Sequence, residues 1–324
     1  PIAKDGEHCD VVSRADFPHD FRRPAQGKAL ILATAEYGVL MPRDVPSGVD
    51  PVAIAADAAV AVVTPAYWNV DAFIAAGFPL GRIYVVPLGV DTTVFRPRDD
   101  TREQMRARLG LKGTVFMNVG AMLENKGIDL LLSAFAKLAA ERSDVQLLLK
   151  GTDNLYRAKD VVEKYLNLLP PNAGELLASR LIYLGETLSN EQMSVLYRAA
   201  DCYVAPYRAE GFGMPVLEAA ACGLPVIATR GGPTEDFLNE DCSRKIRSEL
   251  RVYAPVNVEG VVVKGLEPEL EHLVELMRGV ADDEDWRMRA GAAAVKHVQS
   301  HFTWERVTDQ LVEAFYRMHE GKGA

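Results

Sequence analysis

The stretch "CYVAPYRAEGFGMPVLEAAACGLPVIAT", from Cys202 to Thr229, contains a complete strand–helix–strand unit. "CYVAP" and "PVIAT" are short apolar runs of the kind found in buried strands, and Pro215 suits the first turn of the helix between them. A helix that connects two neighbouring strands makes them parallel. The stretch therefore predicts part of a parallel sheet with helical crossovers.

The same alternation of β-branched runs and helical patterns continues along most of the chain. The run Gly127–Ala140 carries apolar residues with the period of an amphipathic helix. The other predicted strands are Ala29–Thr34, Ala58–Thr64, Ile83–Pro87, Thr114–Gly120, Val145–Gly151 and Leu181–Gly185. The polar segment Leu88–Asp100 divides them into two series. Two such series predict an α/β fold with two Rossmann-like domains, each built on a doubly wound parallel sheet.

Capping residues mark where some of the helices begin. Thr64 favours a helix start directly after a strand, and Thr303 favours one for the tail helix. Ser189 and Gln192 have the spacing of a capping box. The segment Asn239–Lys264 has no clear period, and two short strands within "VYAPVNVEGVVVKG" (Val252–Gly265) remain one interpretation.

The composition is that of a globular protein large enough for two domains. The chain has 324 residues, of which 48% are hydrophobic and 25% charged. Its net charge of −9 argues against general nucleic-acid binding, which depends on many Lys and Arg contacts. Its four cysteines lack metal-ligand spacing and are expected to be buried, reduced thiols of a cytoplasmic protein. No apolar run is long enough to cross a bilayer.

Open parallel sheets bind ligands at the carboxyl ends of their strands, and three strand ends here carry glycine-marked loops. Lys126 follows the first, at a predicted helix entry where an ammonium and free backbone N–H groups suit a phosphate. A solvated surface lysine is the alternative. The third loop, "ATRGGPTED" (Ala228–Asp236), is a weaker signal, because most glycine pairs are only turns.

Two glutamates mark the second strand end. Glu210 lies in a loop beside Gly211, and Glu218 lies about one turn into the predicted helix. An ionised carboxylate only accepts hydrogen bonds, so both side chains suit sugar hydroxyls. The alternatives are a loop charge in water for Glu210 and an interaction with the helix dipole for Glu218. Together, the three strand ends predict a site for a nucleotide sugar.

From about Thr64 onward, the chain resembles the family-4 retaining glycosyltransferases of the GT-B fold. In "EGFGMPVLEAAACGLPVIAT", Glu210 and Glu218 match the E-x7-E signature of that family. The segments "VVPLGVDTTVFRP", "VGAMLENKGIDLLLSAF", "GGPTE" and "HFTWERV" are also similar to family segments in order and spacing. The resemblance implies a hexosyltransferase-like enzyme that moves a sugar from a nucleoside diphosphate to a glycan, lipid-linked or small-molecule acceptor, with retention of configuration.

The resemblance also implies roles for individual residues. Lys126 and Glu210 would be catalytic, with Lys126 on the donor diphosphate, and Glu218 would hold the ribose hydroxyls. The implied donor-binding set is Gly120, Lys126, Gly185, Glu186, Glu210, Gly211, Phe212, Gly213, Met214 and Glu218. No metal or other cofactor is expected, because basic side chains and a helix N-terminus take the place of the cation.

The resemblance also implies a division of the chain into three parts. Residues 1–95 would form a partial acceptor-side domain, residues 96–302 the donor-binding domain, and residues 303–324 a helix that packs back on the N-terminal domain. A Rossmann-like domain normally has about 150 residues. Because the first part is shorter and opens at Pro1, we expect an N-terminal portion to be missing.

One departure from the family concerns the phosphate loop. Ala121 stands where the family usually has an arginine, so either another basic residue substitutes or the diphosphate is held less tightly. Two alternatives to a transferase stay open: a nucleotide-sugar-binding module without turnover, and a nucleotide-sugar epimerase on the same fold. We expect no nucleic-acid partner and a cytoplasmic location, with which peripheral contact to the inner membrane face is compatible.

Overall fold

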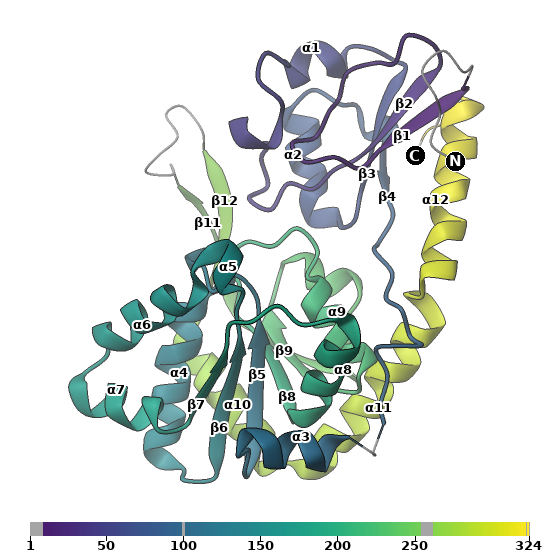
Figure 1. Ribbon diagram of the computed structural model, residues 1–324. Helices are drawn as coiled ribbons and strands as arrows, with labels where there is room; N and C mark the ends of the chain where they lie inside the picture. Colours follow the sequence, from purple (N-terminus) through teal and green to yellow (C-terminus); the bar gives the residue numbers. More distant parts are fainter. Residues whose placement is uncertain (1–8, 99–100, 254–261, 322, 324) are drawn as a thin grey trace. The chain divides into compact units, whose positions relative to one another are not determined.

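The chain forms two compact units, each with its own parallel sheet (Figure 1). The computed structural model describes residues 9–98, 101–253, 262–321 and 323. Unit 1 consists of Pro1–Gly89, Val252–Gly265 and Trp304–Ala324, and unit 2 consists of Val90–Arg251 and Leu266–Thr303. The two parallel sheets with helical crossovers confirm the predicted α/β fold.

Unit 1 contains a four-stranded sheet of order β1-β2-β3-β4. Its strands are β1 (Val11–Arg14), β2 (Lys28–Leu32), β3 (Val60–Thr64) and β4 (Ile83–Val85), all paired in parallel. All five residues of β3 are buried, as expected of a strand covered on both faces. One face packs against α1 (Pro51–Ala55), α2 (Val70–Ala75) and their loops, through a core cluster that includes Phe21, Phe73 and Phe78.

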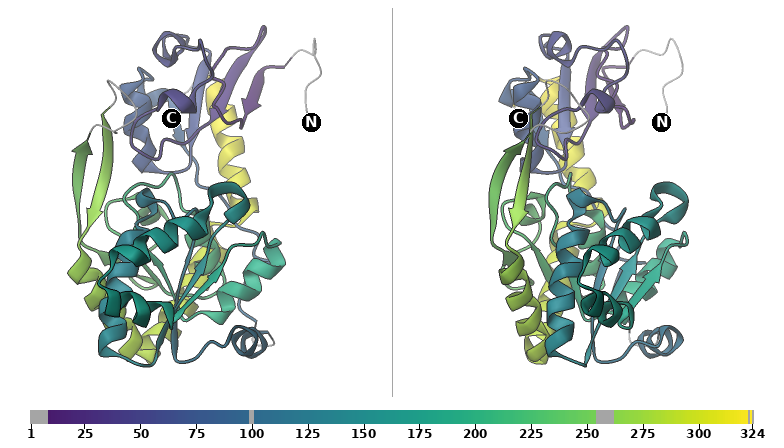
Figure 2. Two further views of the ribbon diagram at one scale, coloured as in Figure 1. Left: turned by 60° about the vertical axis from the view of Figure 1, so that its left-hand side comes forward. Right: turned by 90° about the vertical axis from the view of Figure 1, so that its left-hand side faces the viewer.

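Helix α12 (Trp304–His319), from the far end of the chain, covers the other face of this sheet (Figure 2). Its buried side chains Val307, Ala314 and Met318 pack against apolar residues of β2, β3 and β4. Lys28 of β2 donates hydrogen bonds to the carbonyl oxygens of Met318 and His319, at 2.6 and 3.1 Å. A lysine at these carbonyls satisfies orphan acceptors at the helix end.

Unit 2 contains a six-stranded parallel sheet of order β10-β9-β8-β5-β6-β7. Its strands are β5 (Thr114–Val119), β6 (Val145–Lys150), β7 (Leu181–Leu184), β8 (Cys202–Ala205), β9 (Val226–Thr229) and β10 (Ser243–Ile246). The chain runs outward from β5 to β7, and then returns to the other side of β5 with β8. The strand order therefore reverses between β5 and β8, which makes their carboxyl ends the switch point of the sheet.

Helices cover both faces of the sheet of unit 2. On one face lie α4 (Ile128–Glu141), α6 (Ala158–Leu168), α7 (Pro171–Ala178) and α10 (Leu270–Asp282), which share a core cluster with the strands. On the other lie α3 (Arg102–Leu109), α8 (Asn190–Ala199), α9 (Met214–Ala221) and α11 (Glu284–His301) (Figure 1). There Tyr197 of α8 packs on Tyr203 of β8, with ring centroids 6.2 Å apart. This is the doubly wound arrangement that the sequence predicts.

The structure confirms one predicted helix cap and contradicts another. The Ser189–Gln192 capping box is formed at the start of α8. The prediction for Thr64 is wrong, because a 3₁₀ turn, η2 (Tyr67–Asn69), begins first and has Ala66 at its N-cap. The hydroxyl of Thr64 is instead buried and has no hydrogen-bond partner among the described residues.

The open segment Asn239–Lys264 contains strand β10 and most of a two-stranded sheet. That sheet pairs β11 (Ser248–Tyr253) with β12 (Val263–Pro268), so the interpretation as short strands is right where the chain is described. Residues 254–261 lie outside the described residues. Lys264 N donates to Tyr37 O at 2.9 Å, within unit 1, whereas the family resemblance places this segment in the domain 96–302.

Two further expectations concern the burial of the cysteines and the presence of a membrane-spanning helix. Cys202, Cys222 and Cys242 are buried as predicted, but Cys9 is only half-buried. Burial raises the pKa of the Cys222 thiol to about 12, so this cysteine is a structural residue. Among the described residues, no helix combines the length and the hydrophobicity needed to cross a bilayer.

Candidate functional site

Lys126 and Glu210 meet at the switch point of unit 2. Lys126 ends the short 3₁₀ helix η4 (Glu124–Lys126) after β5, and Glu210 lies in the loop after β8. Lys126 Nζ lies 3.0 Å from Glu210 Oε2, and both side chains are about one-fifth exposed. The second oxygen of Glu210 accepts a hydrogen bond from Gly211 N at 2.9 Å. The fold thus joins two predicted catalytic residues that are 84 positions apart.

Backbone contacts fix the two loops against each other. Asn125 O accepts hydrogen bonds from Arg208 N at 2.7 Å and from Ala209 N at 3.1 Å, and Asn125 Nδ2 donates to Ala209 O at 3.3 Å. Gly127 has a φ of +69°, and a Cβ there would lie 1.9 Å from the carbonyl oxygen of Pro206. Only glycine allows this approach, and the approach positions Lys126 toward Glu210.

Arg208 is part of this site, although the sequence analysis did not select it. Its guanidinium forms a bidentate ion pair with Asp129, with both N–O distances 2.8 Å, and a second pair with Glu267 at 3.1 Å. Burial lowers the pKa of Arg208, but the two carboxylates outweigh burial and raise it overall. Its position two residues before Glu210 is the only signal in the sequence. Its charge is matched by these partners, so it braces the loop rather than offering a cation to a ligand.

The glycine turn after β8 leads into α9. Gly213 has a φ of +101° at the N-cap, and no side chain caps the helix there. An uncapped helix N-terminus presents N–H groups that suit an anion. Phe212 is buried with its ring 4.8 Å from that of Phe237, so only its backbone is left for a ligand.

Glu218 lies on the flank of α9 rather than in water. The hydroxyl of the fully buried Tyr197 donates a hydrogen bond to Glu218 Oε2 at 2.8 Å. Burial raises the pKa of Glu218, and this hydrogen bond opposes the rise. The carboxylate is therefore held in place at the end of the sheet, and is not a freely solvated helix-end charge.

Gly185 and Glu186 lie farther along the same edge of the sheet. They follow β7, which β6 separates from β5. A Cβ at Gly185 would lie 1.7 Å from Asp153 Oδ2, so this glycine is required by packing. Glu186 is exposed. No hydrogen bond or ion pair described for unit 2 connects these two residues to the Lys126–Glu210 pair.

The third glycine loop packs against the loop after β8. The hydroxyl of Tyr207 lies 2.7 Å from Thr234 Oγ1 and donates to Thr229 O at 3.3 Å. A Cβ at Gly232 would lie 2.5 Å from the ring of Tyr207. After this glycine pair the chain forms a short 3₁₀ turn, η5 (Pro233–Asp236).

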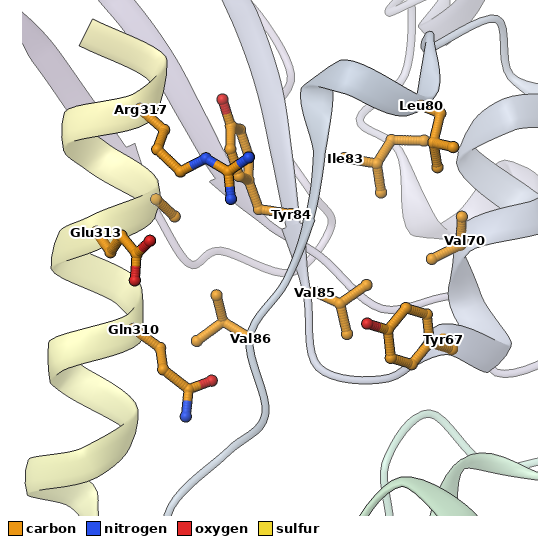
Figure 3. Close-up of a pocket in the computed structure, with 11 residues that line it drawn as sticks. Tyr67, Val70, Leu80, Ile83, Tyr84, Val85, Val86, Gln310, Glu313 and Arg317 are labelled. Atoms are coloured by element: carbon orange, nitrogen blue, oxygen red, sulfur yellow. The ribbon is translucent and has the colours of Figure 1, made fainter. Parts of the chain in front are cut away.

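Unit 1 has a separate cavity of about 380 Å³ beside its edge strand β4 (Figure 3). Val85 of β4 and the following residue, Val86, face it from one side, and Glu313 and Arg317 of α12 face it from another. It contains none of the predicted site residues. Over the part of the chain that the structure describes, no cluster of three His, Cys, Asp or Glu side chains is arranged to hold a metal ion.

Residues 113–253 match the family model described as "Glycosyl transferases group 1". This group 1 segment begins just before β5 and includes the Lys126–Glu210 pair, Glu218 and the strands up to β11. Over longer stretches, the chain is similar to curated members of the same enzyme class. D-inositol 3-phosphate glycosyltransferase 1 of Catenulispora acidiphila is 30% identical over 248 residues, which are 74% of this chain and 53% of that protein.

A second relative, mannosylfructose-phosphate synthase of Agrobacterium fabrum, is 33% identical over 158 residues, which are 48% of this chain and 34% of that protein. The chain thus spans about half, or less, of these relatives. Among solved structures, sucrose-phosphate synthase from Thermosynechococcus elongatus has a TM-score of 0.68 at 22% identity, covering 92% of this chain and 69% of that one.

The Anabaena protein HepE, solved in complex with UDP-glucose, has a TM-score of 0.69 at 18% identity, covering 90% of this chain and 72% of that one. These structural likenesses confirm the GT-B fold. The group 1 segment is accordingly one of the two Rossmann-like domains of a GT-B protein.

Proposed function

We propose that the protein is a glycosyltransferase that moves a sugar from a nucleoside-diphosphate sugar to a glycan, lipid-linked or small-molecule acceptor. The observation that carries this proposal is the Lys126–Glu210 pair at the switch point of the sheet, inside the group 1 segment. Ligands of doubly wound sheets bind at such a point.

The site has groups for both sides of the bond between the sugar and the diphosphate, and Lys126 serves the diphosphate side. The ammonium of Lys126 has three N–H donors, so it retains Glu210 while it also donates to the departing diphosphate. The uncapped N-terminus of α9, which begins at Met214, adds N–H groups to the same charge. Stabilising the leaving group by fixed donors in this way is a preorganised electrostatic contribution to catalysis.

The carboxylates would bind hydroxyl groups. Glu210, next to the Gly211–Gly213 backbone, is the proposed acceptor for hydroxyls of the transferred sugar, and Glu218 for those of the ribose. Gly120 would lie under the phosphates, and Gly185 and Glu186 would face the base. Retention of configuration, transfer without a metal ion and a cytoplasmic location with peripheral membrane contact complete the proposal.

The test begins with the donor. HepE is a structural neighbour in complex with UDP-glucose, so UDP and its sugars are the first probes, followed by the GDP and ADP series. Ligand at 100 times its dissociation constant adds about 2.7 kcal/mol of stability, which a thermal shift resolves. We expect a shift with one nucleotide series, unchanged by magnesium. A shift that requires magnesium would contradict the metal-independent mechanism.

Variants then test the two proposed catalytic residues. Lys126→Ala and Glu210→Gln should each lower sugar transfer by at least about 100-fold, the effect of removing one preorganised donor. Lys137→Ala, which removes an exposed lysine paired with Glu271, should leave transfer unchanged. Near-normal turnover in both site variants would refute the assignment. Nucleotide binding without transfer would favour a binding module, and an isomerised nucleotide sugar would favour an epimerase.

A further inference from the structure

Lys150 lies at the same edge of the sheet as the Lys126–Glu210 pair. It is the last residue of β6, the strand next to β5, and it pairs in register with Val119. Its carbonyl oxygen accepts a hydrogen bond from Gly120 N at 3.1 Å. The backbone of Lys150 therefore holds the first residue of the loop that leads to Lys126.

The side chain of Lys150 is buried, with 4% of its surface exposed. Successive side chains of a strand point to opposite faces, and Leu147 and Leu149 belong to the cluster with α4 and α10. Lys150 therefore points to the face of α8 and α9. Its ammonium donates to Gly151 O, and it retains two further N–H donors.

This ammonium has no carboxylate within ion-pair distance among the described residues. Burial lowers the pKa of Lys150, and the more distant charges of Glu186 and Asp153 oppose that effect. Asp153 already accepts hydrogen bonds from the Tyr183 hydroxyl and from Lys159 N, and Glu186 is exposed. A buried charge without a partner is costly, and such costs are retained chiefly at functional sites.

The cations of the neighbouring loops are already matched. Lys126 forms an ion pair with Glu210, and Arg208 forms ion pairs with both Asp129 and Glu267. Ala121, directly after Gly120, offers no charge. A diphosphate at these strand ends therefore needs positive charge beyond that of the paired side chains.

We propose that Lys150 is a second cationic contact for the diphosphate of the donor, acting beside Lys126 from the adjacent strand end. This proposal rests on the proposed function. It assigns to β6 the positive charge that the loop after β5 does not supply. It also gives the buried ammonium an anion that the described residues of the free protein do not provide.

The first test is the variant Lys150→Met, which keeps the length and apolar stem of the side chain and removes the charge. The variant without ligand should be at least as stable as the wild type, because a buried unpaired charge is lost. Its affinity for UDP, GDP or ADP, whichever binds the wild type, should fall by about 10- to 100-fold, as expected for a hydrogen bond to a charged group. Lys137→Met, with the same change in net charge on an exposed helix face, should bind like the wild type.

Proton uptake gives a readout that a purely structural role would not change. An anion beside Lys150 favours the charged ammonium and raises its pKa, so binding at alkaline pH should take up a proton. Affinity should fall as pH rises through the lowered pKa of the free protein. Calorimetry in buffers of different ionisation enthalpy measures this uptake. The experiment is run at a pH well above about 6, where the phosphate itself titrates, so that the phosphate does not contribute. Lys150→Met should abolish it.

The outcomes separate the two proposals. If the wild type binds a nucleoside diphosphate and Lys150→Met binds it equally well with the same proton uptake, the assignment of Lys150 is wrong and the proposed function stands. If the wild type binds no nucleotide of the panel, both proposals fail. Lower affinity in Lys150→Met together with loss of the proton uptake supports the assignment.

Discussion

At the scale of single residues, Tyr197 and Glu218 show how burial raises the pKa of a carboxyl group and so affects stability. Tyr197→Phe would leave Glu218 without its hydroxyl donor, so we expect a loss of about 1–3 kcal/mol in unfolding free energy at neutral pH. The raised pKa of Glu218 means that the folded state keeps a proton above the ordinary value of 4.5, so stability falls as pH rises through this window. Below it, Glu218 is protonated and the loss should shrink. Urea unfolding of both proteins at pH 7 and near pH 4 measures the difference.

A control isolates the charge of Glu218 in that experiment. In a Glu218→Gln background no carboxylate titrates at position 218, beside Tyr197, so the cost of Tyr197→Phe should be the same at both pH values. An equal cost at both pH values in the wild-type background would contradict the assigned coupling between the two side chains.

Single residues also show the limits of the sequence. Lys126 and Glu210 were predictable, because both stand in glycine-marked loops after strands. Lys150 was not predictable, because the sequence does not show whether a lysine at the end of an apolar strand is buried. Met122 has a φ of +57° although it is not glycine, and its side chain is buried. Such backbone strain follows from tertiary packing, and the residue type alone does not predict it.

At the scale of elements, the contact between η4 and the loop after β8 is testable with two glycines. Gly127 and Gly110 have φ values of +69° and +67°, but an added Cβ meets the Pro206 carbonyl oxygen at 1.9 Å in the first case and nothing within 4 Å in the second. Gly110→Ala should therefore cost only the left-handed strain of about 1–2 kcal/mol. Gly127→Ala should cost clearly more and weaken nucleotide binding, because the loop carrying Lys126 must shift. Chemical unfolding and thermal shifts with nucleotide measure both, and equal costs would contradict the close approach.

Two strands that the sequence failed to predict share one property. β1 and β10 are edge strands of their sheets, and their sequences, "VVSR" and "SRKI", mix charged with apolar residues. Edge strands tolerate polar side chains, and these two lack the continuous apolar run by which the central strands β3, β5 and β6 are recognised. The helix start after β3 was misplaced for another reason: the chain makes a 3₁₀ turn at Tyr67–Asn69 before α2 begins.

At the scale of the whole molecule, unit 1 depends on a helix from the far end of the chain. Met318 is buried against the strands of unit 1, whereas Val312 on the same helix is 45% exposed. Met318→Ala should therefore destabilise unit 1 by about 2–5 kcal/mol, and Val312→Ala much less. Hydrogen exchange should show faster opening of β2, β3 and β4 in Met318→Ala, with β5, β6 and β8 of unit 2 unchanged. Equal acceleration in both units would show that they unfold as one.

Because α12 packs on strands β2 to β4, unit 1 is complete only after the chain of unit 2 has been synthesised. The strands of unit 1 are synthesised first, yet the helix that covers one of their faces follows the whole of unit 2. Unit 2 has all of its described strands and helices once Thr303 has been made, so it can fold during translation, as domains generally do. The earlier strands must wait with that apolar face uncovered. The nascent chain therefore exposes these strands of unit 1 to chaperones for longer than the strands of unit 2.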